Sequence, residues 1–256
     1  MGWRADMEMI RALVRRAANE LLRVPGAAIP GVLAPTIFFL GLTSVFGNLN
    51  ALPGFTSETY QSFLIPISLM QGAGFTGAAT GVNLARDIEQ GWFDRLIVSP
   101  APRAVLLAGL VISASLRSLI PATVLLIVGF SLGVSWPGLG GLAIALVIVL
   151  GMGTLAACWG TVLALRFKSQ SAAPLMQMGM LLLVLTTTAY APLALLTGWL
   201  HTAARFNPVT QVVETARQGF VGGVTWGDTW PGLLALAGLL ALLSALALRG
   251  MRRTAL

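Results

Sequence analysis

The sequence has few charged residues and few of the residue types that build catalytic or metal sites. Charged residues make up 10% of the 256 residues and hydrophobic residues 56%, whereas an ordinary soluble domain carries roughly 25% charged residues. The single cysteine, Cys158, excludes an internal disulfide and a multi-cysteine metal site. The single histidine, His201, has no second ligand at metal-binding spacing, so we expect a solvated interfacial residue and no metal. This composition predicts an integral membrane protein.

The sequence also lacks motifs for nucleotide binding and for catalysis. HExxH is missing, and no acidic residue lies within an apolar segment, which disfavours zinc hydrolases and proton-coupled carriers. A Walker A loop needs Gly-Lys-Ser/Thr, but the only lysine, Lys168, follows Phe167. We therefore expect no enzyme and no cofactor bound by this chain. The 16 basic residues lie mainly in the loops between apolar segments, a distribution that does not indicate nucleic-acid binding.

Six apolar segments are each long enough to cross a bilayer, which takes about 20 residues. The predicted fold class is therefore an all-α integral membrane protein with six transmembrane helices. The spans lie near residues 27–46, 61–85, 105–132, 139–165, 172–195 and 230–248, within a transmembrane domain of residues 25–253.

The distribution of Arg and Lys predicts the orientation of these spans. Thirteen basic residues lie on one side of the six spans, whereas only Arg205 and Arg217 lie on the other. Because cytoplasmic loops are enriched in basic residues, both termini are predicted to be cytoplasmic, in an inner or plasma membrane. All basic residues but Lys168 are arginine, which indicates a bacterial gene of high GC content.

Residues 1–24 are predicted to form a cytoplasmic amphipathic helix on the membrane surface. Apolar residues recur on one helical face, and basic residues such as Arg11 and Arg15 lie on the opposite face, a pattern that favours binding to anionic lipids. The apolar positions are Ile10, Leu13, Val14, Ala17 and Leu21.

The stretch from Asn83 to Arg103 combines charge with helical amphipathicity in the interior of the chain. Ile88, Trp92 and Leu96 recur every fourth residue, and charged or polar residues occupy the remaining faces. This pattern predicts a short helix between spans two and three that seats its apolar face at the membrane and presents its polar face to a soluble partner. The alternative is an interfacial helix that only orients the two spans.

A second amphipathic helix is predicted before span six. Asn207 and Pro208 provide a helix start, and Glu214 and Arg217 are three residues apart, a spacing at which they pair. The helix is expected to dip into the outer leaflet and to end at Gly222 and Gly223. Its apolar stripe comprises Val209, Val212, Val213, Ala216 and Phe220.

Polar residues within the spans mark a candidate substrate path. Polar groups in hydrocarbon normally face protein or a water-filled cavity. Arg117 is the one charge inside a span, and it either contacts an anionic substrate or pins the helix, which Pro121 should kink. The spacing from Gly77 to Gly81 favours close helix packing, either within the subunit or between two subunits. The path residues are Gln71, Thr76, Thr80, Asn83, Arg117, Gln177, Thr186 and Tyr190.

The order of these features resembles the ABC-2 type permease subunits of ABC transporters, and most closely the daunorubicin-resistance exporter type. The resemblance covers residues 24–253. One pattern that carries it is FNPVTQVVETARQGFVGG, residues 206–223. Asp87 stands where the family usually has glutamate. The other pattern consists of Asp87, Glu89 and Gly91, followed by Asp94-Arg95-Leu96 and Ser99-Pro100.

The resemblance implies a permease that dimerises with an identical or related subunit and docks a separate cytosolic P-loop ATPase, which binds the ATP and Mg. The helix between spans two and three would then be the coupling helix, and the helix before span six an external re-entrant helix. Membrane lipids would surround the assembly. The coupling residues would be Arg86, Asp87, Glu89, Gln90, Gly91, Trp92, Asp94 and Arg95.

Three functions are compatible with the sequence. The first is the export of amphipathic or hydrophobic drugs, antibiotics or lipids. The second is the export of lipid-linked polysaccharide on the same fold. The third belongs to another class: a membrane-embedded lipid-metabolising enzyme or an ATP-independent carrier. The absence of a grouped nucleophile, base or metal ligand disfavours the enzyme.

Overall fold

The computed structural model of the chain describes residues 3–23, 29–47, 57, 59–93 and 102–253, and their regular secondary structure is helical. The α-helices are α1 (Trp3–Arg23), α2 (Ile29–Phe46), α3 (Tyr60–Glu89), α5 (Arg103–Arg117), α6 (Leu119–Ser131), α7 (Gly138–Phe167), α8 (Ala173–Leu185), α9 (Gly198–Phe206), α10 (Pro208–Val221) and α11 (Trp226–Arg253). Two 3₁₀ turns are present: η3 (Gln170–Ala172) precedes α8, and η4 (Leu193–Leu195) lies between α8 and α9. The all-α prediction is confirmed for this part of the chain.

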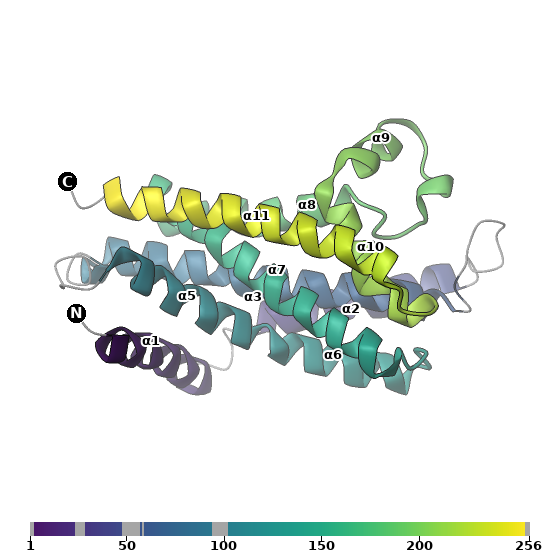
Figure 1. Cartoon of the computed structure of the whole chain (residues 1–256), viewed down its shortest axis with the longest axis horizontal. Helices are drawn as coiled ribbons and strands as arrows, with labels where there is room; N and C mark the ends of the chain where they lie inside the picture. Colours follow the sequence, from purple (N-terminus) through teal and green to yellow (C-terminus); the bar gives the residue numbers. More distant parts are fainter. Residues whose placement is uncertain (1–2, 24–28, 48–56, 58, 94–101, 254–256) are drawn as a thin grey trace.

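The long helices form one elongated bundle (Figure 1). α3, α5 and α11 all pack against α7, while α1 lies beside α5 at one end of the bundle. We call this end, which also holds the C-terminal ends of α3, α7 and α11, the terminal end. The opposite end, which holds α9 and α10, is the distal end (Figure 1).

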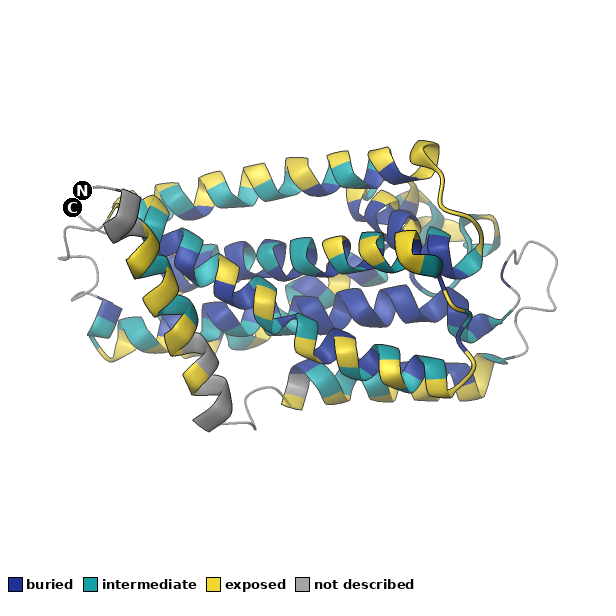
Figure 2. Ribbon diagram, turned by 60° about the horizontal axis from the view of Figure 1, so that its bottom comes forward, coloured by how far each residue is buried: buried dark blue, intermediate teal, exposed yellow. Residues whose placement is uncertain are grey.

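The most buried element is α3, which lies at the centre of the bundle (Figure 2). Small residues allow α7 to approach it closely: a Cβ added at Gly160 would lie 2.9 Å from the Cα of Gly81. A Cβ at Gly77 would overlap Gly153 and Ala156 of the same helix. The small-residue spacing on α3 therefore serves packing within the subunit, one of the two alternatives that the sequence left open.

Three helical stretches among the described residues are long and apolar enough to span a membrane: Arg103–Ser131, Gly138–Phe167 and Trp226–Arg253. Shorter apolar helices cover Gly31–Phe46 and Gln170–Leu185. α3 has 30 residues, which is sufficient to cross a membrane. It is buried on most of its faces, as expected for a helix at the centre of the bundle. The chain is thus a helical membrane protein, and the number of six spans stays a prediction.

The structure has a one-residue break close to Pro121, where the sequence predicted a kink. The helix of the third apolar segment is interrupted at Ser118, between α5 and α6. Proline has no N–H to donate to the carbonyl one turn earlier, which belongs to Arg117.

The predicted end of span five near residue 195 is wrong, because α8 stops at Leu185. The hydroxyls of Thr186 and Thr187 donate to the carbonyls of Leu182 and Val184, at 3.0 and 2.6 Å. Such local bonds compete with the helical ladder. Residues 186–191 are therefore non-helical inside the bundle, and their backbone groups need other partners.

The short helix predicted within the stretch from Asn83 to Arg103 does not begin as a separate element before Gly91. Residues 83–89 are the last turns of α3, and the chain turns at Gly91, whose φ of +69° suits glycine. No glycine or proline interrupts the sequence between Gly81 and Gly91, so the helix of span two continues through the charged residues. Trp92 and Phe93 begin a new helical turn, and residues 94–101 lie outside the described part of the chain.

Candidate functional site

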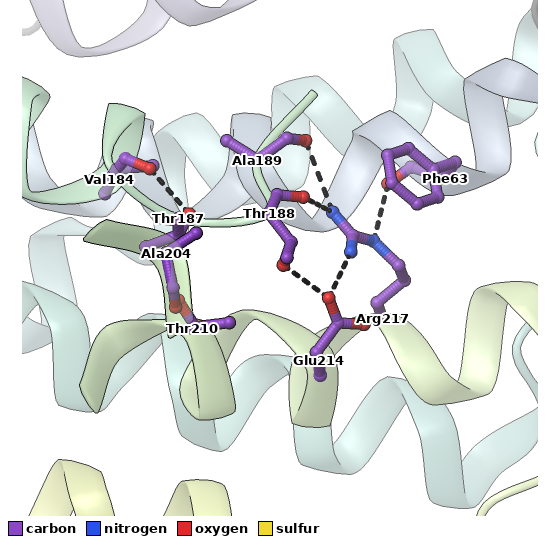
Figure 3. A network of polar contacts seen from close by, with 9 residues as sticks. All are labelled: Phe63, Val184, Thr187, Thr188, Ala189, Ala204, Thr210, Glu214 and Arg217. Carbon is purple, nitrogen blue, oxygen red and sulfur yellow. Dashed lines mark hydrogen bonds and ion pairs between the residues drawn. The ribbon is translucent and has the colours of Figure 1, made fainter. Parts of the chain in front are cut away.

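At the distal end, Arg217 of α10 is the centre of a buried polar cluster (Figure 3). The side chain is 4% exposed, and its Nη1 donates to Glu214 Oε1 at 2.7 Å. This confirms the pair predicted from the three-residue spacing. The guanidinium carbon also lies 3.7 Å from the centre of the Phe63 ring, in cation–π geometry.

Arg217 satisfies backbone carbonyls from two other elements. Its Nη2 donates to the carbonyls of Thr188 and Ala189, at 2.8 and 3.2 Å, and its Nε donates to the carbonyl of Phe63 at 3.1 Å. The Thr188 hydroxyl donates to Glu214, which completes the cluster (Figure 3). A single arginine thus joins α3 and α10 to the non-helical residues 186–191.

Asn207 binds the C-terminal end of α8, where the non-helical residues 186–191 begin. Its side-chain oxygen accepts from the N–H of Val209 at 2.9 Å and caps α10, and Pro208 occupies the first helical position, as predicted. Its Nδ2 donates to the carbonyl of Leu183 at 2.9 Å and to Thr186 Oγ1 at 3.0 Å. The amide therefore caps one helix and binds the end of another.

Tyr190 and Gln71 extend these contacts toward the centre of the bundle. Gln71 Nε2 donates to the Tyr190 hydroxyl at 2.7 Å, and the Tyr60 hydroxyl donates to the carbonyl of Tyr190 at 3.1 Å. Three predicted path residues, Gln71, Thr186 and Tyr190, thus lie around the interruption of α8.

A cavity of about 680 Å³ adjoins the cluster. It brings together the Glu214–Arg217 pair, whose glutamate is 46% exposed, and Asp228 at the start of α11. Its lining mixes polar side chains with Phe63, Leu193 and Val221, so the cavity suits a compound that has both polar and apolar parts.

At the terminal end, Asp87 is bound by the amino-terminal helix. Arg16 of α1 lies 3.1 Å from Asp87 Oδ2, and its guanidinium carbon lies 3.7 Å from the centre of the Trp92 ring. The sequence predicted the amino-terminal helix and singled out Asp87 and Trp92, but it did not predict their contact with Arg16. Arg16 and Asp87 are 71 positions apart. Basic residues on the polar face of α1 were the only signal for it.

Glu89 is held by the connection between α7 and α8. Its carboxylate accepts from Gln170 Nε2 at 2.6 Å, from Ser169 Oγ at 2.7 Å and from the backbone N–H of Gln170 at 2.9 Å. These bonds, led by that from the Gln170 side chain, lower the pKa of the Glu89 carboxyl below its ordinary value. Asp87 and Glu89, two of the three acids among the predicted coupling residues, are therefore both bound within the chain.

The other predicted coupling residues are divided by exposure. Arg86 and Gln90 are exposed at the end of α3, while Gly91 and Trp92 are half-buried. Asp94 and Arg95 lie outside the described residues.

The predicted path residues do not form one continuous group. Thr80, Asn83 and Arg117 line a cavity of about 210 Å³ at the terminal end, where Arg117 Nη2 donates to Thr80 Oγ1 at 2.8 Å. Thr76 faces Gly31 of α2, and Gln177 is half-buried on α8. The predicted path therefore divides between the two ends, with α3 connecting them.

Comparison with known proteins gives one family match and several distant relatives. The family model described as ABC-2 type transporter matches residues 8–221. A daunorubicin resistance ABC transporter permease protein, DrrB1 of Streptomyces coeruleorubidus, is 24% identical over 91% of this chain and 82% of its own length. A probable doxorubicin resistance ABC transporter permease protein, DrrC of Mycobacterium tuberculosis, is 25% identical over 82% of this chain and 75% of its own. A putative transport permease, ycf38 of Cyanophora paradoxa, is 25% identical over 80% and 71%.

Proposed function

The chain belongs to the ABC-2 type transporter family, and from this premise we propose that it exports amphipathic or hydrophobic compounds from the cytoplasm or the inner leaflet. As a permease subunit of this family it is a multi-pass membrane protein that lacks its own ATPase domain and works with a separate ATPase subunit.

The continuity of α3 carries the proposal. This one helix runs for 30 residues, from Tyr60 and Phe63 in the distal cluster to Asp87 and Glu89 at the terminal end. Because α3 is an unbroken, mostly buried helix, a force applied at its terminal end is transmitted to the Arg217 cluster as a rigid-body movement. That geometry suits a transporter whose energy source binds at one end and whose release site opens at the other.

The proposed docking surface for the ATPase is the exposed end of α3 together with the turn that follows. Arg86 and Gln90 are exposed there. Asp87 and Glu89 have a supporting role in this proposal, because their bonds to α1 and to the α7–α8 connection fix the position of the surface. ATP and Mg would be bound by the partner ATPase.

Two observations favour amphipathic cargo over lipid-linked polysaccharide. The distal cavity has a mixed polar and apolar lining, and two of the relatives are named for resistance to daunorubicin or doxorubicin. We further propose a dimer of this chain with an identical or related permease, in a bacterial inner membrane with both termini in the cytoplasm.

Transport by inside-out vesicles tests the proposal. Vesicles containing this chain and its ATPase subunit should take up doxorubicin when ATP and Mg are supplied. Replacing the Walker A lysine of the ATPase subunit should abolish this uptake. Uptake that continues without a functional ATPase would show an ATP-independent carrier and contradict the proposal.

Crosslinking in native membranes tests the docking surface separately. A photo-reactive amino acid in place of Gln90 should form an adduct that mass spectrometry identifies as a P-loop ATPase. The same amino acid in place of the exposed Thr225, at the distal end, is the matched control and should give no such adduct. An ATPase adduct from position 225 but not from position 90 would reverse the assignment of the two ends.

A further inference from the structure

The cavity of about 210 Å³ at the terminal end lies between α1, α3 and α5 and is lined mainly by polar and charged side chains, two of which, Arg86 and Gln90, also belong to the proposed docking surface. One face of α3 contributes Thr80, Asn83, Asp87 and Gln90, which follow one another at helical spacing. α5 provides a second polar stripe, Ser113 and Arg117, and α1 covers the cavity with Leu13 and Arg16. The result is a polar groove that leads from the end of the bundle toward its interior.

The lining of this groove is positively charged. It contains the guanidinium groups of Arg16, Arg86 and Arg117 and one carboxylate, that of Asp87, so the formal charge of the lining is +2. Asp87 forms an ion pair with Arg16, with 3.1 Å between Asp87 Oδ2 and Arg16 Nη2. Arg117 reaches across the groove to Thr80 at 2.8 Å, which positions its guanidinium group between α5 and α3. A concave lining with excess positive charge attracts anions, and guanidinium groups match the geometry of phosphate oxygens.

We propose that this groove binds a phosphate group, such as that of an anionic lipid. The cavity has several times the ≈ 30 Å³ that one water occupies in the liquid, so it holds a phosphate headgroup but not acyl chains. Ile112, Leu116 and Ile120 are exposed and recur every fourth residue along α5 and α6, and the first two directly precede Ser113 and Arg117, which line the groove. Acyl chains can lie along these apolar side chains while the phosphate contacts Arg117 and Arg86. Basic pockets between membrane helices bind lipid headgroups elsewhere in the same way.

The proposal does not depend on which compound the protein exports. It requires only that phosphate, supplied by a lipid or as the free ion, enters the groove. Native mass spectrometry of the full-length purified chain provides the test. Dioleoyl phosphatidylglycerol should bind, and dioleoylglycerol, which has the same acyl chains but no phosphate, should not. Equal binding of the two would overturn the proposal.

Variants locate the site. Arg117→Gln and Arg86→Gln should each weaken phosphatidylglycerol binding by roughly tenfold, because each removes charge-assisted hydrogen bonds to the phosphate. Arg86 is exposed, so its substitution leaves the bundle folded and keeps the test decisive if Arg117→Gln disturbs packing. Arg166→Gln is the matched control: Arg166 is an exposed arginine at the same end, outside the groove.

Competition with inorganic phosphate separates the two sources. Phosphatidylglycerol that stays bound in excess inorganic phosphate supports a lipid ligand, and displacement supports the soluble ion in the same groove. The proposal fails if both groove variants bind phosphatidylglycerol as the unmodified chain does. It also fails if Arg166→Gln weakens binding as much as they do.

Discussion

Because α8 stops at Leu185, the carbonyls of Thr188 and Ala189 have no helical N–H partner, and Arg217 donates to them instead. Replacing Arg217 with Leu leaves the carbonyls of Phe63, Thr188 and Ala189 without this donor. An unsatisfied buried polar group costs roughly 1–3 kcal/mol, so we expect Arg217→Leu to lower the midpoint of thermal unfolding in detergent clearly. Arg217→Lys should recover only part of the loss, because an ammonium group cannot reproduce the planar fork of a guanidinium group.

Arg205→Leu is the control for this prediction, since Arg205 is an exposed arginine on the neighbouring helix α9. Its substitution should change the unfolding midpoint little. If Arg217→Leu were as stable as Arg205→Leu, the cluster of Figure 3 would not hold the interrupted helix in place.

Glu89 makes a contact that should depend on pH. The folded state holds the pKa of Glu89 below its ordinary value, mainly through the bond from the Gln170 side chain. The folded state therefore binds fewer protons at this site than the unfolded state, so the contact stabilises the fold above the ordinary carboxyl range. This contribution is lost as the pH falls through the lowered pKa.

Glu89→Gln tests this dependence, because glutamine keeps the length of the side chain but does not titrate. The variant should be less stable than the unmodified chain at neutral pH, and the difference in unfolding midpoint should vanish once the pH is below the lowered pKa. A difference that is constant over this whole range would show that the charge of Glu89 does not contribute.

At this scale the sequence predicted pairs that are close along the chain and missed pairs that are distant. The three-residue spacing was sufficient for Glu214 and Arg217, and the Asn-Pro dipeptide was sufficient for the start of α10. The contacts of Arg217 with Phe63 and of Arg16 with Asp87 join separate helices. The spacing of residues along the chain gives no information on contacts between separate helices, so the bonds that Asp87 and Glu89 make within the chain were not foreseen.

At the scale of elements, the contact between α3 and α7 depends on glycine. A Cβ at Gly81 would overlap the backbone of Gly160, and overpacking of a core typically costs about 1–3 kcal/mol. We expect Gly81→Leu to force the two helices apart and to lower the midpoint of thermal unfolding. Gly238→Leu on α11 is the matched control, because a Cβ at Gly238 has no atom within 4 Å. Similar midpoints for the two variants would contradict the close contact.

The presence of helices was easier to predict than their ends. Long apolar runs gave the helices α5 to α7 and α11. The end of α8 was missed because the three consecutive threonines 186–188 lie within a long, mainly apolar run, while the hydroxyls of Thr186 and Thr187 bind preceding carbonyls. The end of α3 was missed because charged residues suggested a boundary, whereas α1 and η3 provide those charges with partners and the helix continues.

At the scale of the whole molecule, the two ends of the bundle differ in charge. The terminal end carries Arg86, Arg166 and Lys168 together with the basic last turn of α11, while α9 and α10 at the distal end carry only Arg205 and Arg217. The arrangement in Figure 1 places at one end the loops that the sequence had assigned to one side of the membrane. Sequence alone could assign these segments to a side but could not show that α3 links the two polar clusters.

Accessibility labelling of single cysteines tests the orientation that follows from this asymmetry. The native Cys158 is buried and is first replaced with alanine. Cytoplasmic loops carry the excess of Arg and Lys, so an impermeant thiol reagent added outside intact cells should label cysteines at His201 and Asp228. Cysteines at Asp6, Gln90, Ser169 and Thr254 should react only after permeabilisation. Labelling of position 90 from outside would place the end of α3 away from the cytoplasm, where no ATPase could reach it, and would refute the proposed docking surface.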